Sequence, residues 1–109
     1  MYKNAGNILK VVEDSKKNNL KVVLWGAGVN GKVLLDLFEK KHVRIDEVVD
    51  KDISKQENEI YGYIIKEPQE VLENANIILA TSDKIYEDVF DVASKRGIEV
   101  VNIGELIGY

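Results

Sequence analysis

Three glycines, Gly26, Gly28 and Gly31, have the spacing G-x-G-x-x-G and directly follow a short apolar run. In such a turn the first glycine allows a sharp change of direction, the second lets backbone approach a phosphate, and the third lets a helix pack closely on a sheet. The free N–H groups of the first helical turn and the helix dipole then attract an anion. The spacing predicts a phosphate-binding turn made by Gly26, Ala27, Gly28, Val29, Asn30 and Gly31.

An acidic residue ends the next apolar run. Asp50 follows Gly31 by about 20 residues, the separation at which a carboxylate accepts hydrogen bonds from the ribose hydroxyls of a dinucleotide. The adjacent Lys51 would suit a 2′-phosphate, but Asp50 would repel that phosphate, so the pattern favours NAD slightly over NADP. The alternative is that the glycines only turn the chain and that Asp50 only ends a strand.

S-adenosylmethionine is a competing ligand, because methyltransferases also place a glycine turn after a first strand and an acid after a second. Their usual pattern is G-x-G-x-G, and this chain has Asn30 where the last glycine would stand. The spacing therefore disfavours a methyltransferase.

No constellation of catalytic side chains accompanies the glycine turn. None of the five tyrosines is followed four residues later by lysine, the pair that short-chain dehydrogenases and epimerases use. The single histidine, His42, is expected at a helix end rather than as a general base. No zinc site is expected, because the chain has no cysteine and one histidine. We therefore expect no catalytic residue and no metal, and an incomplete enzyme at most.

The elements that would position these residues alternate between strands and helices. A leading helix lies within residues 1–19. A second helix begins at Val29 and has on one face Val29, Val33, Leu34, Leu37 and Phe38. The segment Asp50–Glu59 is expected to be a solvated, mobile loop. Pro68 opens a short helix, and a last helix carries Ile85, Val89, Phe90 and Ala93 inward. The expected strands are Val22–Trp25, Ile45–Val49, Ile60–Ile65, Ile77–Ala80 and Val100–Ile103.

These elements predict an α/β fold: one doubly wound, mostly parallel sheet of five strands in the order 3-2-1-4-5, with an N-terminal helix. In that order Thr81 and Ser82, after the fourth strand, would face the ligand across from Gly28. The cluster Thr81-Ser82-Asp83 also suits a helix N-cap, a role that we expect above all of Ser82 or Asp83. A chain of 109 residues allows one domain, residues 1–109.

Composition narrows the class of protein further. The net charge is −4, and there is no basic stripe, which argues against nucleic acid as a partner. The lack of cysteine fits a reducing compartment, and no apolar run is long enough for a membrane span or signal peptide. We expect a cytoplasmic protein with no membrane partner. Exposed sheet edges make a homodimer a reasonable expectation.

Several segments resemble the Rossmann-like nucleotide-binding domains of sugar-nucleotide and polysaccharide-biosynthesis proteins. Such domains form the N-terminal part of nucleotide-sugar dehydratases and sugar acetyltransferases. The resemblance covers 20–106 and rests on the segments Val22–Gly31, Val48–Asp50, Tyr61–Ile65, Pro68–Leu72 and Ile78–Ser82. It implies a domain that binds NAD(P) or a nucleotide-sugar without carrying the chemistry itself.

Two further classes of function stay open at this point. The chain could be a module that senses a ligand, with occupancy ordering the Asp50–Glu59 loop and changing the binding of a partner protein. It could also be a small NAD-dependent oxidoreductase. The hypothesis that we favour is that the chain is a nucleotide-binding domain that acts with a separate catalytic protein.

Overall fold

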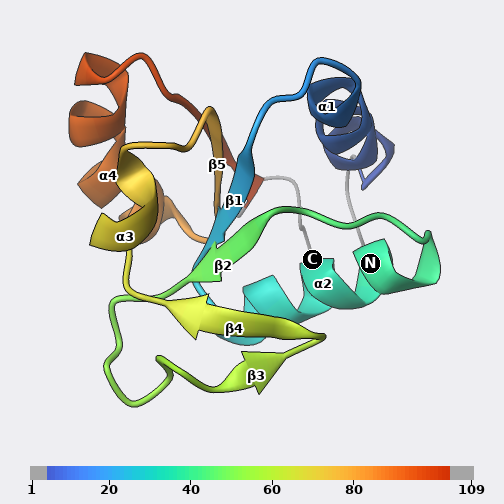
Figure 1. Ribbon diagram of the computed structural model, residues 1–109, viewed down its shortest axis with the longest axis horizontal. Coiled ribbons are helices and arrows are strands. Elements are labelled where there is room, and N and C mark those ends of the chain that lie inside the picture. The colour runs from blue at the N-terminus through green and yellow to red at the C-terminus, as the bar shows by residue number, and fades with distance from the viewer. Residues whose placement is uncertain (1–4, 104–109) are drawn as a thin grey trace.

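The computed structural model describes residues 5–103, in which helices alternate with strands except where three strands follow one another between residues 47 and 66 (Figure 1). The helices are α1 (Ala5–Lys17), α2 (Val29–Lys40), α3 (Gln69–Leu72) and α4 (Asp83–Lys95). The strands are β1 (Val22–Trp25), β2 (Glu47–Val49), β3 (Glu59–Ile60), β4 (Tyr63–Lys66), β5 (Ile77–Ala80) and β6 (Glu99–Asn102). The prediction of an α/β fold is confirmed.

The sheet has six strands in the order β3-β4-β2-β1-β5-β6. Every neighbouring pair is parallel except β3 and β4, which are antiparallel. The prediction of five strands in the order 3-2-1-4-5 is therefore wrong. The error arises at Tyr61 and Gly62, whose φ angles of 49° and 85° fold the expected single strand 60–65 into a hairpin. Arg44 fixes this hairpin by donating to the carbonyl of Tyr61 at 2.8 Å.

Helices cover both faces of the sheet, α1 and α2 on one side and α3 and α4 on the other (Figure 1). The side chains of β1 and β5 are buried throughout, as their continuous apolar runs predicted. Leu24 and Leu79 belong to the core under α1 and α2, whereas Val23 and Ile78 belong to the core under α3 and α4. The carboxyl ends of these central strands carry the glycine turn and Thr81.

Two apolar residues expected on inward helical faces are exposed. Val29, the first residue of α2, is 74% exposed. Phe90 on α4 is 46% exposed and packs against Tyr86 with ring centroids 5.3 Å apart. The buried stripe of α4 consists of Val89 and Ala93. The helical spacing predicted which face of each helix packs against the sheet. It did not distinguish the residues in the middle of that face from those at its edge.

The carboxylate of Glu47 on β2 forms ion pairs with lysines of two neighbouring segments. Its carboxylate lies 2.6 Å from the ammonium of Lys66 on β4 and 3.0 Å from that of Lys21, next to β1. Burial opposes ionisation of this carboxyl group, but hydrogen bonds and charge from Lys66 and Lys21 outweigh it and lower the pKa of Glu47. The ionised form therefore helps to hold β2 between its neighbours.

We expect Glu47→Gln to lower the free energy of unfolding at neutral pH by up to about 1 kcal/mol, the scale for a partly exposed ion pair. Because the pKa of Glu47 is lowered on folding, its contribution is complete above the ordinary value of 4.5 and is lost as the pH falls through the lowered value. Urea unfolding between neutral pH and pH about 3 would measure this, with Glu99→Gln on β6 as the control. Parallel stability curves for wild type and Glu47→Gln across that range would contradict it.

Candidate functional site

The glycine turn between β1 and α2 is held by contacts that two of its glycines make possible. Gly26 has a φ of 113°, and its N–H donates to the carbonyl of Val49 at 2.8 Å. A Cβ on Gly26 would overlap the hydroxyl of Thr81, and a Cβ on Gly31 would overlap the carbonyl oxygen of Gly26. Both positions require glycine because of the protein's own packing.

Gly28 differs from the other two glycines. It has an extended conformation with a φ of −84°, which any residue adopts. The one described atom near a Cβ at this position is the Nζ atom of Lys55, at 3.7 Å, an ordinary contact distance. The described part of the chain therefore gives no steric reason for glycine here, and the space beside Gly28 is available to another molecule.

The N-terminus of α2 has no side-chain cap. By contrast, the hydroxyl of Ser82 caps α4 and accepts a hydrogen bond from the N–H of Ile85 at 3.2 Å. The capping role expected of Ser82 is confirmed. The uncapped turn of α2 keeps backbone donors and the positive end of the helix dipole facing the space beside Gly28.

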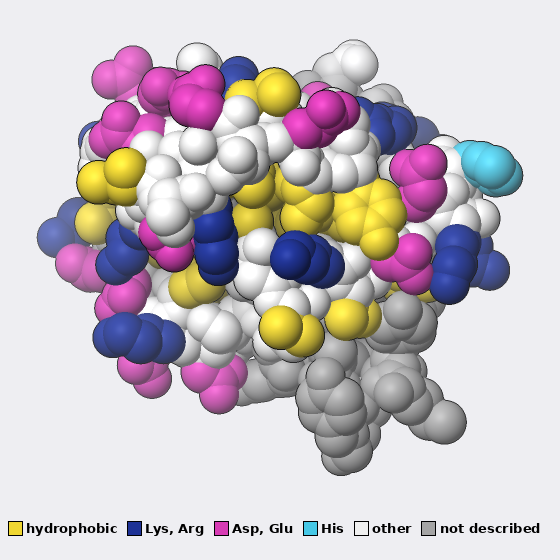
Figure 2. Space-filling view, turned by 90° about the horizontal axis from the view of Figure 1, so that it is seen from below, with side chains coloured by type: hydrophobic (Ala, Val, Ile, Leu, Met, Phe, Trp, Pro, Cys, Tyr) yellow, Lys and Arg dark blue, Asp and Glu magenta, His cyan; other side chains and the backbone are white. Residues whose placement is uncertain are grey.

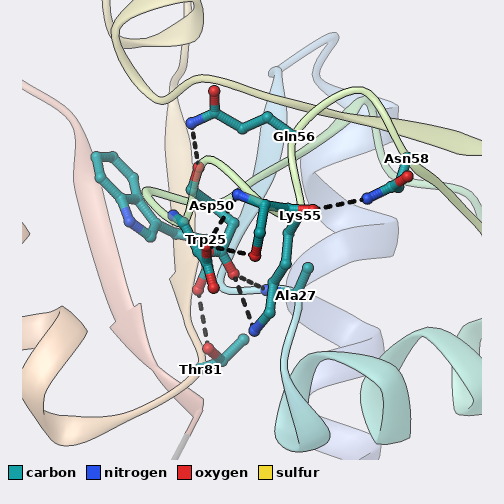
Figure 3. A network of polar contacts seen from close by, with 9 residues as sticks. Trp25, Ala27, Asp50, Lys55, Gln56, Asn58 and Thr81 are labelled. Carbon is teal, nitrogen blue, oxygen red and sulfur yellow. Dashed lines mark hydrogen bonds and ion pairs between the residues drawn. The ribbon is translucent and has the colours of Figure 1, made fainter.

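Asp50 joins the glycine turn to the loop that follows β2 (Figure 3). One carboxylate oxygen accepts from the N–H of Ala27 at 2.8 Å, and the other accepts from the N–H of Asp52 at 2.8 Å. The side chain is 14% exposed. Asp50 thus holds the conformation of the turn, and a ribose hydroxyl at this carboxylate would share oxygens that already accept backbone hydrogen bonds.

The other predicted site residues lie around this turn in different roles. The amide of Asn30 donates to the carbonyl of Thr81 at 2.9 Å, and the hydroxyl of Thr81 donates to the carbonyl of Trp25 at 2.9 Å. Thr81 is 4% exposed, so its hydroxyl ties β5 to β1 rather than facing the space beside Gly28. Lys51 extends towards α4, where its ammonium lies 3.8 Å from the carboxylate of Asp88.

The loop after β2, expected to be solvated and mobile, is held by hydrogen bonds from its own polar side chains. Asp52 accepts from the N–H and the hydroxyl of Ser54, which lowers the pKa of Asp52. Gln56 donates to the carbonyl of Asp50 at 2.9 Å, and Asn58 donates to the carbonyl of Ser54 at 2.9 Å (Figure 3). The alternation Asp50-x-Asp52-x-Ser54 is typical of successive Asx turns and was the available signal for this order.

Lys55 is a residue of the candidate site that sequence reasoning missed. The loop brings its ammonium to 3.8 Å from the carboxylate of Asp50 and beside Gly28 (Figure 3). Together with Lys32 from α2 it lines a hollow of about 200 Å³ that also borders Ala27. Figure 2 shows Lys or Arg side chains beside a strip of apolar ones on the face that carries this loop. Nothing in the sequence distinguished Lys55 from the other lysines of a charged segment.

Within 5–103, no group of three or more His, Cys, Asp or Glu side chains is arranged to hold a metal ion. Over the same residues, no helix is long and apolar enough to cross a membrane.

Comparison with known proteins assigns the chain to a family. Residues 18–103 match the family model described as C2185-like, N-terminal, and the chain belongs to that family. Its structure is similar to the crystal structure of UDP-D-quinovosamine 4-dehydrogenase from Vibrio fischeri, with a TM-score of 0.61 and 21% sequence identity. The match covers 82% of this chain and 98% of the other, and it shows a shared fold. No curated protein matches the chain.

The glycine geometry predicts that two substitutions differ in their effect on stability. Gly31→Ala should lower the free energy of unfolding by about 1–3 kcal/mol, because the new methyl group meets backbone that cannot move aside. Gly28→Ala should cost less than about 1 kcal/mol, the scale for a changed N-cap residue. Denaturant unfolding of the two variants measures the difference. Equal destabilisation would show that the space beside Gly28 is not open.

Proposed function

We propose that this protein is a Rossmann-like domain that binds a nucleotide through its phosphates at the glycine turn. The ligand is NAD(P) or a nucleotide-sugar, and the domain serves sugar-nucleotide or polysaccharide biosynthesis. The observation that carries this proposal is the environment of Gly28. The protein itself explains Gly26 and Gly31, whereas an incoming phosphate is what a missing Cβ at Gly28 would accommodate.

The charges around the turn support an anionic ligand. The uncapped start of α2 offers backbone N–H donors, and the ammonium of Lys55 stands on the open side of the turn. A phosphate placed there would receive hydrogen bonds from backbone and charge from lysine, a combination typical of phosphate sites. In the ligand-bound state Lys55 would move its ammonium from Asp50 to the phosphate.

The comparisons support the choice of ligand class. The name of the structurally similar protein contains a UDP-sugar, a nucleotide that carries a diphosphate. The family description refers to an N-terminal region, which agrees with a binding domain that works beside another protein unit. We extend both to this chain as part of the proposal.

The described side chains favour binding over catalysis. The hydroxyl of Tyr61 lies 3.3 Å from the carboxylate of Asp36. Desolvation and the charge of Asp36 raise the pKa of Tyr61, the opposite of what a phenolate base requires. A separate catalytic protein would therefore supply the acid and base groups.

A second candidate function is ligand sensing, which the position of Asp50 favours. This one carboxylate accepts hydrogen bonds from both the glycine turn and the loop after β2. A ligand that draws Lys55 away from Asp50 would thus change the loop as well as the turn. Hydrogen exchange of residues 51–58 with and without ligand tests this function, and unchanged exchange rates in the bound state would rule it out.

Calorimetric titration tests the principal proposal. We expect NAD, NADP or one of a set of UDP- and GDP-sugars to bind the wild type, and Gly28→Val to abolish that binding while the protein stays folded. A Cβ at position 28 would have the Nζ atom of Lys55, at 3.7 Å, as its near neighbour and would meet no backbone, so the valine side chain would occupy the open space beside the turn. Val33→Ile, which changes the size of a side chain in the same helix, is the matched control and should bind as the wild type does. Failure of every nucleotide to bind the wild type would end the proposal.

The ammonium of Lys55 beside Gly28 allows a second, independent test of the proposed phosphate site. Lys55→Met should weaken binding of the same nucleotide about tenfold, which corresponds to ~1.4 kcal/mol, on the scale of one charge-assisted hydrogen bond. Lys84→Met removes an exposed lysine of α4 and serves as the matched control. Lys55→Arg should restore most of the affinity. Equal affinities of wild type and Lys55→Met, measured at low salt, would remove Lys55 from the site.

A further inference from the structure

The strand β6 forms one edge of the sheet, and no further strand lies beyond it among residues 5–103. β6 is parallel to β5, and the N–H of Glu99 donates to the carbonyl of Asn76, next to β5, at 3.1 Å. Because successive residues of a strand direct their backbone groups to opposite sides, the N–H and the carbonyl of Val100 point away from β5. This edge therefore offers a backbone donor and a backbone acceptor to an incoming strand.

The two aromatic residues of α4 lie on the side of the helix that faces this edge. Asp83, Tyr86 and Phe90 have the spacing i, i+3, i+7, which places them along one face of α4. The carboxylate of Asp83 accepts a hydrogen bond from the side-chain amide of Asn102 on β6 at 2.8 Å. The face that carries Tyr86 and the exposed Phe90 is therefore the one beside β6, and it adds an apolar surface to the strand edge.

Other apolar residues of α4 face away from β6. Ile85 and Val92 lie seven residues apart on one side of the helix, where they line a hollow of about 190 Å³ together with Leu72 of α3. Val92 is 44% exposed, nearly the same as Phe90 at 46%. Two apolar side chains of equal exposure thus lie on opposite sides of one helix, and only Phe90 lies on the side next to the strand edge.

The charges of α4 suit a second copy of the same helix that runs in the opposite direction. The first half of the helix is acidic on balance, with the charged residues Asp83, Lys84, Glu87 and Asp88. At the other end Lys95 pairs with Asp91 at 3.3 Å, and Arg96 adds a further positive charge. An antiparallel pair of these helices brings the acidic half of each near the basic end of the other, which is attractive, whereas a parallel pair brings like charges together.

We propose that the protein forms a dimer through β6 and α4, with a second copy of this chain as the partner. The two β6 strands run antiparallel about a two-fold axis perpendicular to the sheet, so that α4 of both copies lies on the same side. The side chain of Val100 packs on that side. Val100 meets its own counterpart at the axis, where the two residues exchange a pair of backbone hydrogen bonds. Tyr86 and Phe90 of both copies cover this junction.

A second copy fits this surface better than an unrelated strand does. An unrelated strand pairs with β6 alone and leaves Tyr86 and Phe90 exposed. A second copy brings its own aromatic pair to the junction together with the complementary distribution of charge on α4. Two-fold pairing also uses the β6 edge of both copies, so the assembly closes at two chains.

Sedimentation velocity over a wide range of protein concentration, without any nucleotide, tests the dimer. We expect a dimer for the wild type and for the control Val92→Glu. Phe90→Glu should raise the dissociation constant at least about a hundredfold, because each dimer loses two buried aromatic contacts. Phe90→Ser should act in the same direction without adding a charge. A wild type that stays monomeric at every concentration, or equal dimerisation of Phe90→Glu and Val92→Glu, would overturn the proposal.

Hydrogen exchange resolved at single amides locates the contact. The N–H of Val100 points away from β5, so it should exchange slowly in the wild-type dimer and at least about tenfold faster in Phe90→Glu. The N–H of Val101 points towards β5 and serves as the internal reference, protected in both proteins. Fast exchange at Val100 in a wild-type dimer would place the contact elsewhere and refute the proposal. Slow exchange at Val100 in a monomer would mean that another segment of the same chain covers the edge, which also refutes it.

Discussion

The carboxylate of Asp50 is the contact on which the arrangement of the site depends. It accepts from the N–H of Ala27 in the glycine turn and from the N–H of Asp52 in the loop after β2. Because the side chain is only 14% exposed, these hydrogen bonds form in surroundings where an unpaired charge would be costly. Without the carboxylate, the N–H of Ala27 in the turn would lose its partner, and the loop would lose the hydrogen bond at Asp52 that helps to bring Lys55 to Gly28.

Much of the fold was predictable because its central strands are buried on both faces and its turns carry glycine, proline and capping residues. β1 and β5 were placed at their observed bounds, and Ser82 was placed as an N-cap. The hairpin at Tyr61 and Gly62 was not predicted. The segment 60–65 is rich in β-branched and aromatic residues, a composition that predicts one continuous strand. The contact that fixes the bend comes from Arg44, which is distant in the sequence.

The candidate site was predictable only where backbone geometry requires a residue type. Glycine spacing located the turn, because Gly26 and Gly31 meet protein atoms that no Cβ could approach. It could not show that Thr81 points inward or that Asp50 already accepts two backbone hydrogen bonds. Lys55 belongs to a residue type found throughout ordinary protein surfaces. Its place beside Gly28 depends on the conformation of the loop after β2 rather than on a local sequence pattern.

The hairpin has a consequence for how molecules of this protein meet one another in concentrated solution. β3 forms one margin of the sheet, has only two residues and runs opposite to its neighbour. An outer strand so short presents few unpaired backbone groups to a passing chain. The hairpin thereby leaves little backbone for further hydrogen bonding at that edge of the sheet, and it disfavours the pairing of strands between molecules that leads to aggregates.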